Sequence, residues 1–382
     1  MPTYGPLRAG TYLWRNKGKS LPLVGVIVLA VMLVSGIVAM MDSIPLSIRT
    51  IYSYSRHYVG LTPRGDPEMT GKIRQTIEQE APVPLDRVMA VRGLDLNVMS
   101  IVGKWPFVIL ALKPEDMSYY MDHVGPGELE GRMPKDGEPE VVLSEPVMRN
   151  LGVKIGDVVL GPDKPEAYSP YKVKIVGKVH SQEWTAVIPY DYVAANHFPP
   201  VDALLAFAKT PVEQAKLDHW AEKRFTGERA RVFAFHKLEK DTSEMFRILY
   251  KILDVVVGML VVVITIMMGM LISIFLSQRV QEFGLLQALG YTKKAILQRV
   301  MGEMTAVVVG GWVAGVLCAY LLLNVVRATL MDPKAFMLDP FDRTAYFYTL
   351  PVPVAIYTVA LATVVARFRR FDPVAVVERR LV

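Results

Sequence analysis

Residues 255–277 read VVVGMLVVVITIMMGMLISIFLS and contain no charged side chain. At 1.5 Å of rise per residue, a helix of this length is about 35 Å long, close to the roughly 30 Å thickness of bilayer hydrocarbon. Three further uncharged apolar runs lie at residues 21–41, 304–326 and 350–366. The sequence therefore predicts four transmembrane helices, because buried helices of a soluble protein seldom keep such runs free of charge over this length.

The interval between the first two runs gives the fold class. About two hundred residues of ordinary polar sequence separate residues 21–41 from residues 255–277, which is enough for a domain with its own core. The first run is too long for the apolar part of a cleaved signal peptide and is followed by no clear A-x-A site, so we expect it to remain as an anchor. We predict an α-helical membrane protein with four transmembrane helices and a large α+β extracytoplasmic domain inserted between the first and second.

Basic residues set the expected orientation. Residues 1–20 carry four basic and no acidic side chains, residues 278–303 carry four and two, and residues 367–382 carry five and two. The large segment 42–254 has 27 basic and 30 acidic side chains. By the positive-inside rule both termini and the 278–303 loop are cytoplasmic. The basic net charge of +6 thus reflects topology, and we expect no nucleic-acid partner.

These observations predict the following segments: 1–20, a cytoplasmic interfacial helix; 21–41, the first span; 42–250, the extracytoplasmic α+β domain with stalk helices; 251–277, the second span; 278–303, a cytoplasmic loop; 304–326, the third span; 327–349, a short extracytoplasmic loop; 350–366, the fourth span; and 367–382, a cytoplasmic tail. In the extracytoplasmic domain, Ser144 is expected to cap a helix over 145–151. Between 238 and 253 no Pro or Gly occurs, so one helix should run from the domain into the second span.

Several kinds of chemistry are missing from the sequence. It has no G-x-x-x-x-G-K-[ST] loop for ATP, no H-E-x-x-H or C-x-x-C metal motif and no G-x-S-x-G elbow. The one cysteine, Cys318, excludes an intrachain disulfide. The predicted spans hold almost no ionisable side chains, which disfavours an ion-coupled transporter. We therefore expect a non-catalytic membrane subunit with no cofactor or metal of its own.

The 278–303 loop has the pattern of a docking element. Phe283, Leu286 and Leu289 recur at helical spacing and predict one exposed apolar face, which either fits a groove on a partner or lies on lipid headgroups. Gly290 is expected to end this short helix, and Thr292 to cap the helix that follows. In the third span, Gly311 and Gly315 form a G-x-x-x-G pair that allows close helix packing, although glycine is also simply common in membrane helices.

The same loop resembles the signature of the MacB/FtsX-like family of ABC transporter permeases, approximately R-x-x-E-I-G-x-L-x-A-L-G-A followed by a helix ending in Glu. The matching positions are Arg279, Glu282, Gly284, Leu286, Ala288, Leu289, Gly290 and Glu303. Phe283 and Tyr291 depart from the pattern. Two further stretches resemble the family: Glu140 to Asp157, which contains a Gly-Asp turn, and the tail from Arg370 to Glu378 with its Asp-Pro helix start.

The resemblance implies a partner and a mechanism. Family members dimerise with a second permease copy or a paralogue and bind two copies of a cytoplasmic ABC ATPase, which holds the ATP and Mg²⁺. Closure of the ATPases moves the loop, and the movement passes through the second span and its stalk to the extracytoplasmic domain, which is called mechanotransmission. The loop residues above, with Phe283, are then the ATPase-coupling residues. The implied location is the bacterial cytoplasmic (inner) membrane, in contact with lipids and with a periplasmic adaptor or substrate-carrying protein.

Three functions remain open at this point. The first is a permease that exports or extracts a hydrophobic or amphipathic substrate such as a lipid, lipoprotein, glycolipid, peptide or drug, and the large domain favours it. The second is an FtsX-like signalling permease that controls an extracytoplasmic enzyme without transport. The third is a membrane receptor or scaffold unrelated to ABC transporters.

Overall fold

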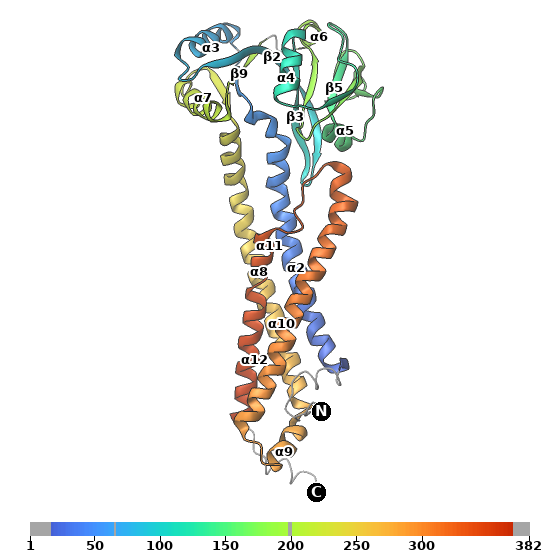
Figure 1. Ribbon diagram of the computed structural model, residues 1–382, viewed down its shortest axis with the longest axis vertical. Helices are drawn as coiled ribbons and strands as arrows, with labels where there is room; N and C mark the ends of the chain where they lie inside the picture. Colours follow the sequence, from blue (N-terminus) through green and yellow to red (C-terminus); the bar gives the residue numbers. More distant parts are fainter. Residues whose placement is uncertain (1–16, 65, 198–200, 370–382) are drawn as a thin grey trace. The chain divides into compact units, whose positions relative to one another are not determined.

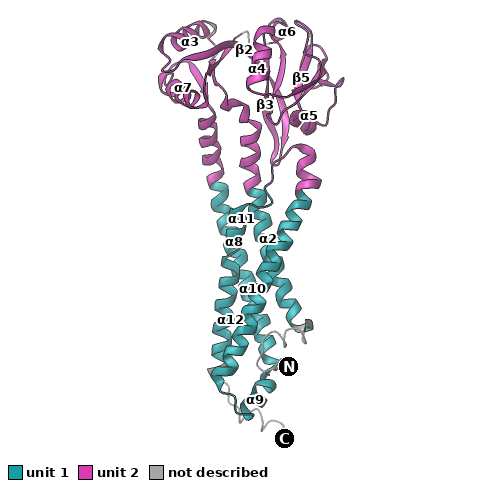
Figure 2. Ribbon diagram, viewed as in Figure 1, with its two compact units in different colours: residues 1–41, 248–326, 339–382 teal, residues 42–247, 327–338 magenta. Residues whose placement is uncertain are grey.

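The computed structural model describes residues 17–369, except for residue 65 and residues 198–200. The expected interfacial helix at the N-terminus and most of the expected tail therefore lie outside the described residues. The chain divides into two compact units (Figure 2). One, the helical unit, comprises residues 1–41, 248–326 and 339–382; the other, the sheet unit, comprises residues 42–247 and 327–338.

Among the described residues, four helices are long and apolar enough to cross a membrane, as predicted: Ser20–Ile51, Phe235–Ser277, Lys293–Lys334 and Arg343–Arg367. They correspond to α2 (Lys17–Ile51), α8 (Phe235–Ser277), α10 (Lys293–Val326) with the turns after it, and α11 (Arg343–Phe347) followed by α12 (Pro351–Arg369). Backbone groups in hydrocarbon must be paired within their own segment, so uncharged runs of this length become helices. The two long helices α2 and α8 continue well past their apolar runs.

Glycine lets two helices of the helical unit approach closely. A Cβ atom at Gly311 of α10 would lie 3.1 Å from Cβ of Ile27, and one at Gly315 would lie 2.7 Å from Cβ of Val31. Both partners belong to α2. Gly310 has nothing within 4 Å of its Cβ position. The Gly311 and Gly315 pair therefore faces α2, and Gly310 does not take part in this contact.

Replacing Gly315 by leucine should destabilise the helical unit, because the side chain has to displace Val31 at an already close helix contact. Overpacking of this kind costs about 1–3 kcal/mol. We expect a lower thermal unfolding midpoint in detergent for Gly315→Leu and an unchanged midpoint for the neighbouring Gly310→Leu. Equal midpoints for the two variants would contradict the assigned packing.

Polar contacts fasten the remaining helices of this unit. At one end Trp312 Nε1 donates to Thr349 Oγ1 (3.0 Å) and the Tyr348 hydroxyl donates to Asp254 Oδ1 (2.8 Å). At the other end Arg367 Nη2 donates to Ser273 Oγ (2.9 Å). The segment just before α12 is therefore bonded to both α8 and α10, and the far end of α12 is bonded to α8.

The sheet unit is built on a ten-stranded sheet with the strand order β10-β1-β9-β2-β3-β8-β5-β7-β4, in which β6 pairs with β7 (Figure 1). The strands are β1 (Val59–Pro63), β2 (Leu85–Ser100), β3 (Gly103–Leu112), β4 (Glu128–Gly131), β5 (Glu140–Ser144), β6 (Val158–Leu160), β7 (Val173–His180), β8 (Ala186–Pro189), β9 (Ala203–Ala208) and β10 (Ala230–Phe233). The helices are η1 (Ser53–Arg56), α3 (Pro67–Glu80), α4 (Pro114–His123), α5 (Glu145–Leu151), α6 (Tyr190–Asn196), α7 (Pro211–Arg224), and the turns η2 (Arg327–Met331) and η3 (Asp332–Lys334). The mixture of helices and strands agrees with the predicted α+β domain.

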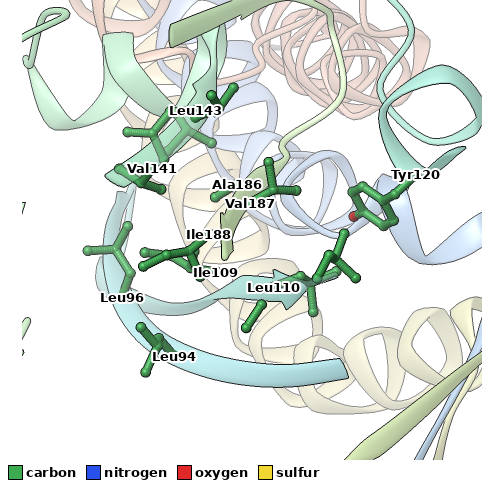
Figure 3. Close-up of a cluster of buried hydrophobic side chains, with 14 of the residues drawn as sticks. Leu94, Leu96, Ile109, Leu110, Tyr120, Val141, Leu143, Ala186, Val187 and Ile188 are labelled. Atoms are coloured by element: carbon green, nitrogen blue, oxygen red, sulfur yellow. The ribbon is translucent and has the colours of Figure 1, made fainter. Parts of the chain in front are cut away.

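The unit contains two hydrophobic cores. In the larger one, side chains from β2, β3, β5, β8 and α4 converge, among them Leu96, Ile109, Tyr120, Val141 and Ile188 (Figure 3). Strand β2 alternates between buried and exposed positions from residue 93 to 100, the pattern of a strand with one solvated face. In the smaller core, α3 and α7 pack on β1, β9 and β10. The long hairpin of β2 and β3, which pairs Ser100 with Gly103 at its end, belongs to the larger core.

The helix predicted after Ser144 forms over Glu145–Leu151, but the predicted cap is wrong. The Ser144 hydroxyl makes no capping bond and instead accepts a hydrogen bond from the Thr185 backbone N–H (2.9 Å). Because Ser144 is fully buried beside β8, its hydroxyl serves a strand neighbour. Gly152 ends the helix in the left-handed region, at φ +68°.

Candidate functional site

The predicted docking segment forms a short helix, α9 (Val280–Ala288), between α8 and α10. Gly290 ends it with φ +91°, and the N–H groups of Gly290 and Tyr291 donate to the carbonyls of Gln287 (2.9 Å) and Leu286 (3.1 Å). This pair of bonds is a Schellman motif, which needs a left-handed residue and so favours glycine. Thr292 then caps α10, since its hydroxyl accepts from the Ala295 N–H (3.3 Å). Both local predictions are confirmed.

Four charged side chains meet where α8, α9 and α10 come together. Arg279 donates to Glu282 (Nε to Oε2, 2.9 Å) and to both carboxylate oxygens of Glu303. Arg299 donates to Glu303 (Nε to Oε1, 3.1 Å) and to Glu282 (Nη2 to Oε1, 3.2 Å). Each guanidinium therefore bridges the same two carboxylates. We call Arg279, Glu282, Arg299 and Glu303 the ion-pair lock.

The lock is buried at its centre. The side chain of Glu303 is fully buried and that of Arg279 is 2% exposed, whereas Glu282 is 32% exposed and connects the lock to solvent. The guanidinium of Arg279 lies 5.2 Å from the ring centroids of both Phe275 and Phe283. Burial disfavours the charge, but the hydrogen bonds that Arg279 donates to Glu282 and Glu303 outweigh it and raise the pKa of Arg279. Arg279 is thus held as a cation by aromatic faces and carboxylates at once.

A buried pair of this kind contributes more to geometry than to net stability. Desolvation offsets much of its Coulomb energy, yet removing one partner leaves a buried charge uncompensated and costs about 3–5 kcal/mol. The lock joins the N-cap and first turn of α9 to the first part of α10, and Arg279 also contacts Phe275 near the end of α8. We infer that it fixes the direction in which α9 lies relative to both helices.

The predicted apolar face of α9 is partly wrong. Phe283 and Leu286 are buried, at 4% and 7% exposure, so they hold α9 against its own chain. The exposed apolar side chains are Leu285 (66%) and Leu289 (69%), with Ala288 exposed between them. Spacing alone cannot tell which side of a nine-residue helix faces its own neighbours. The exposed surface formed by Leu285, Ala288 and Leu289 is called the leucine face below.

The residues expected in the coupling loop therefore separate into two groups. Arg279, Glu282, Phe283, Gly284, Leu286 and Glu303 belong to the lock or to buried positions. Ala288, Leu289 and Gly290 are exposed. Gly311 and Gly315 lie on α10 against α2, apart from both groups.

Three residues that contribute to the candidate site were not identified from the sequence. Arg299 precedes Glu303 by four residues on one helix, a spacing that predicts an ion pair and could have revealed it. Phe275 lies four residues before Arg279, but only its contact identifies it. Leu285 carries no sequence signal that separates it from Leu286. Among the described residues, no group of three or more His, Cys, Asp or Glu side chains is arranged to hold a metal ion.

One family model matches part of the chain. Residues 255–368 match the model described as FtsX-like permease C-terminal, a range that contains the lock, the leucine face and the glycine pair. No curated protein matches the sequence. The similarity to this family therefore covers the segment that builds the candidate site.

Solved structures match about half of the chain, and only distantly. The periplasmic region of MacB from Actinobacillus actinomycetemcomitans is 10% identical, with a TM-score of 0.27, over 49% of this chain and 92% of that structure. The extracellular domain of the noncanonic ABC-type transporter YknZ from Gram-positive bacteria is 11% identical, with a TM-score of 0.26, over 46% of this chain and 99% of that structure.

Proposed function

We propose that the chain is a permease of the MacB/FtsX-like ABC transporter family, since residues 255–368 match the FtsX-like permease model, and that it couples ATP hydrolysis by a separate ATPase to movement of its sheet unit. The movement exports or extracts a hydrophobic or amphipathic substrate. ATP and Mg²⁺ bind to the partner ATPase, of which two copies serve a pair of permeases. This chain contributes no catalytic group and acts by transmitting displacement.

The observation that carries the proposal is the combination of the leucine face with the ion-pair lock. Leu285 and Leu289 are exposed on a helix whose other side is buried, bonded to α10 by charged hydrogen bonds and in contact with α8 through Phe275. A helix held in this way can transmit a displacement to its neighbouring helices, whereas a flexible loop would change its own conformation instead. Two leucines one helical turn apart fit an apolar groove on a partner.

The orientation follows from charge. The segments 1–20, 278–303 and 367–382 are together strongly basic, whereas residues 42–254 are slightly acidic. We infer that α9 faces the cytoplasm, where the ATPase is, and that the sheet unit lies outside the cytoplasmic (inner) membrane. Because α8 is a single helix from Phe235 to Ser277, displacement at its cytoplasmic end can reach β10, which directly precedes it.

The surface of α8 supports a second permease copy or paralogue as partner. Met245, Ile248, Ile252, Val255 and Met259 are exposed and repeat every three or four residues, which is the spacing of a coiled-coil seam. Arg247, Lys251 and Asp254 occur in the same stretch, and such charges disfavour lipid hydrocarbon. Exposed apolar side chains among them are better covered by another helix than by lipid.

A cysteine at Ile252 should therefore form a disulfide with its counterpart in a second permease. In a Cys318→Ala background, we expect Ile252→Cys to give a cross-linked dimer under mild oxidation in membranes. Arg247→Cys lies on the opposite side of the same exposed helix and should remain monomeric. Dimers of equal yield from both positions would contradict the assigned seam.

An ABC ATPase sought among the genes beside this one provides the test of the proposed function. We expect it to co-purify with the permease and its ATP hydrolysis in nanodiscs to change when the permease is present. Absence of a partner ATPase, or hydrolysis indifferent to the permease, would favour a receptor or scaffold.

The family match keeps one alternative, an FtsX-like signalling permease in which the same movement switches an extracytoplasmic enzyme. The two functions differ in outcome. Transport releases a membrane-derived or periplasmic substrate in proportion to ATP consumed, directly or through an adaptor or carrier protein. Signalling changes the activity of a separate enzyme and releases nothing.

A further inference from the structure

The connection between α10 and α11 contains a short element that belongs to the sheet unit. Residues 327–338 join two helices of the helical unit in sequence, but by their contacts they cluster with residues 42–247. The part that makes these contacts, Asp332–Met337, is called the strap. The short extracytoplasmic loop expected over 327–349 is thus divided in two, because only its first half finds partners in the sheet unit.

Asn150 makes the closest of these contacts. Its side chain, in the last turn of α5, is 5% exposed. The amide accepts from the Met99 N–H (2.8 Å), donates to the Met99 carbonyl (2.9 Å) and donates to the Lys334 carbonyl (2.8 Å). One buried amide therefore pairs with both backbone groups of Met99 on β2 and, at the same time, with the strap.

Two further contacts fasten the strap. Arg149 Nη1 donates to the Asp332 carbonyl (3.5 Å), so two successive residues of α5 reach it. Ser47 Oγ of α2 accepts from the Met337 N–H (3.2 Å) and donates to the Met337 carbonyl (3.4 Å). The strap is consequently held at its beginning by α5 and at its end by α2.

The strap is also stiff. Ala335 has φ +55°, the only described non-glycine residue with positive φ, a conformation that costs a non-glycine residue about 1–2 kcal/mol. The Ala335 N–H donates to the Asp332 carbonyl (3.1 Å) and the Phe336 N–H to the Met331 carbonyl (3.0 Å). A tight turn with its own bonds passes a displacement on with little loss.

From this geometry we propose that the strap is a second transmission element and that Asn150 is the positioning residue that connects it to the hairpin of β2 and β3. The inference rests on the proposed function, since it presupposes that nucleotide moves α10. Displacement of α10 reaches the strap through the chain itself, at Val326 and Arg327. Asn150 then shifts Met99, which lies just before the end of the hairpin. Displacement reaches the smaller core by a separate path that does not involve the strap, because β10 leads directly into α8.

Two fluorescent labels can distinguish displacement that passes through the strap to the hairpin from displacement that passes through α8 to the smaller core. In a Cys318→Ala background, one label is placed at Val102→Cys at the hairpin end (54% exposed) and the other at Val212→Cys at the start of α7 (68% exposed). The permease in complex with its ATPase, in nanodiscs, is compared with and without ATP and vanadate. When the strap and Asn150 are unaltered, the fluorescence emission of both labels should change on addition of nucleotide.

Two variants then interrupt the strap in different ways. Asn150→Ala removes the amide. A Gly-Ser-Gly-Ser insertion between Val326 and Arg327 leaves the side chains that hold the strap unchanged but interrupts the helix and makes the link to α10 flexible. We expect each to reduce the response at Val102 by at least about five-fold while the response at Val212 persists. If Asn150→Ala does not fold, the insertion alone decides, because it leaves the buried amide in place.

The outcomes distinguish this inference from the proposed function. An unchanged response at Val102 in the insertion variant, with ATP hydrolysis intact, would overturn the strap as a transmission element and leave the proposed function standing. If the otherwise unaltered protein supports ATP hydrolysis but neither label changes its emission, both the inference about the strap and the proposed function are refuted. Equal losses at Val102 and Val212 would show a general structural role for the strap and would also overturn the inference.

Discussion

Substituting aspartate for Leu285 and Leu289 together should abolish productive binding of the ATPase while leaving the permease folded. Both side chains are more than half exposed, so their replacement removes no packing within the chain. In an apolar groove, two such anchors contribute about 2 kcal/mol each, and the affinity should fall by about 1,000-fold. Titration of the purified ATPase against permease in nanodiscs measures this.

Gln281→Asp is the matched control. Gln281 is exposed on the same helix and receives the same carboxylate without loss of an apolar side chain. We expect its affinity for the ATPase to stay within about two-fold of the unaltered protein, as for most surface substitutions. Undiminished binding by the double leucine variant would mean that the ATPase docks elsewhere.

Replacing Glu303 by leucine should release α9 from its neighbours. The substitution removes the carboxylate that Arg279 and Arg299 share, and loss of one partner from a buried ion pair costs about 3–5 kcal/mol. We expect hydrogen exchange over residues 280–292 to accelerate by about 100-fold or more, and ATP hydrolysis to lose its dependence on the permease. Exchange in the sheet unit should not change.

A second variant separates geometry from charge. Apolar replacement of a complete buried ion pair is often neutral or stabilising, so Glu303→Leu combined with Arg279→Met and Arg299→Leu should recover much of the lost protection. As a control, Glu78→Gln alters an exposed pair with Arg74 on α3 and should have no measurable effect. Slow exchange in the single Glu303→Leu variant would show that the lock does not hold α9.

Phe283 and Leu286 illustrate where prediction of the site failed. Their spacing correctly indicates a helix with an apolar side, since periodicity depends only on local geometry. The same spacing cannot say whether that side meets a partner or the chain's own helices, because both environments bury apolar surface. The structure places these two residues inside, so aspartate at either would disrupt the loop itself rather than the docking surface.

Gly290 and Thr292 show the opposite case. The end of α9 and the start of α10 depend on one left-handed residue and one hydroxyl, and both requirements are met by residue type alone. Ser144 seemed equally local, yet its hydroxyl bonds to β8, because a buried donor from another strand competed with the helix end. A cap can be predicted where the segment is exposed and is less certain where strands pack against it.

The sequence by itself determined that this chain has four segments long and apolar enough to cross a membrane, carries one mixed domain between the first two of them and resembles an ABC permease. These conclusions follow from runs of apolar residues, from the positions of Lys and Arg and from a compact motif, all of which act locally or through composition. Only the tertiary structure decided which side of α9 is exposed, that Arg299 completes the lock, and that Asn150 bonds to Lys334, 184 residues away in sequence. Such contacts depend on how distant segments pack, and no single stretch of sequence encodes the identity of its distant neighbour.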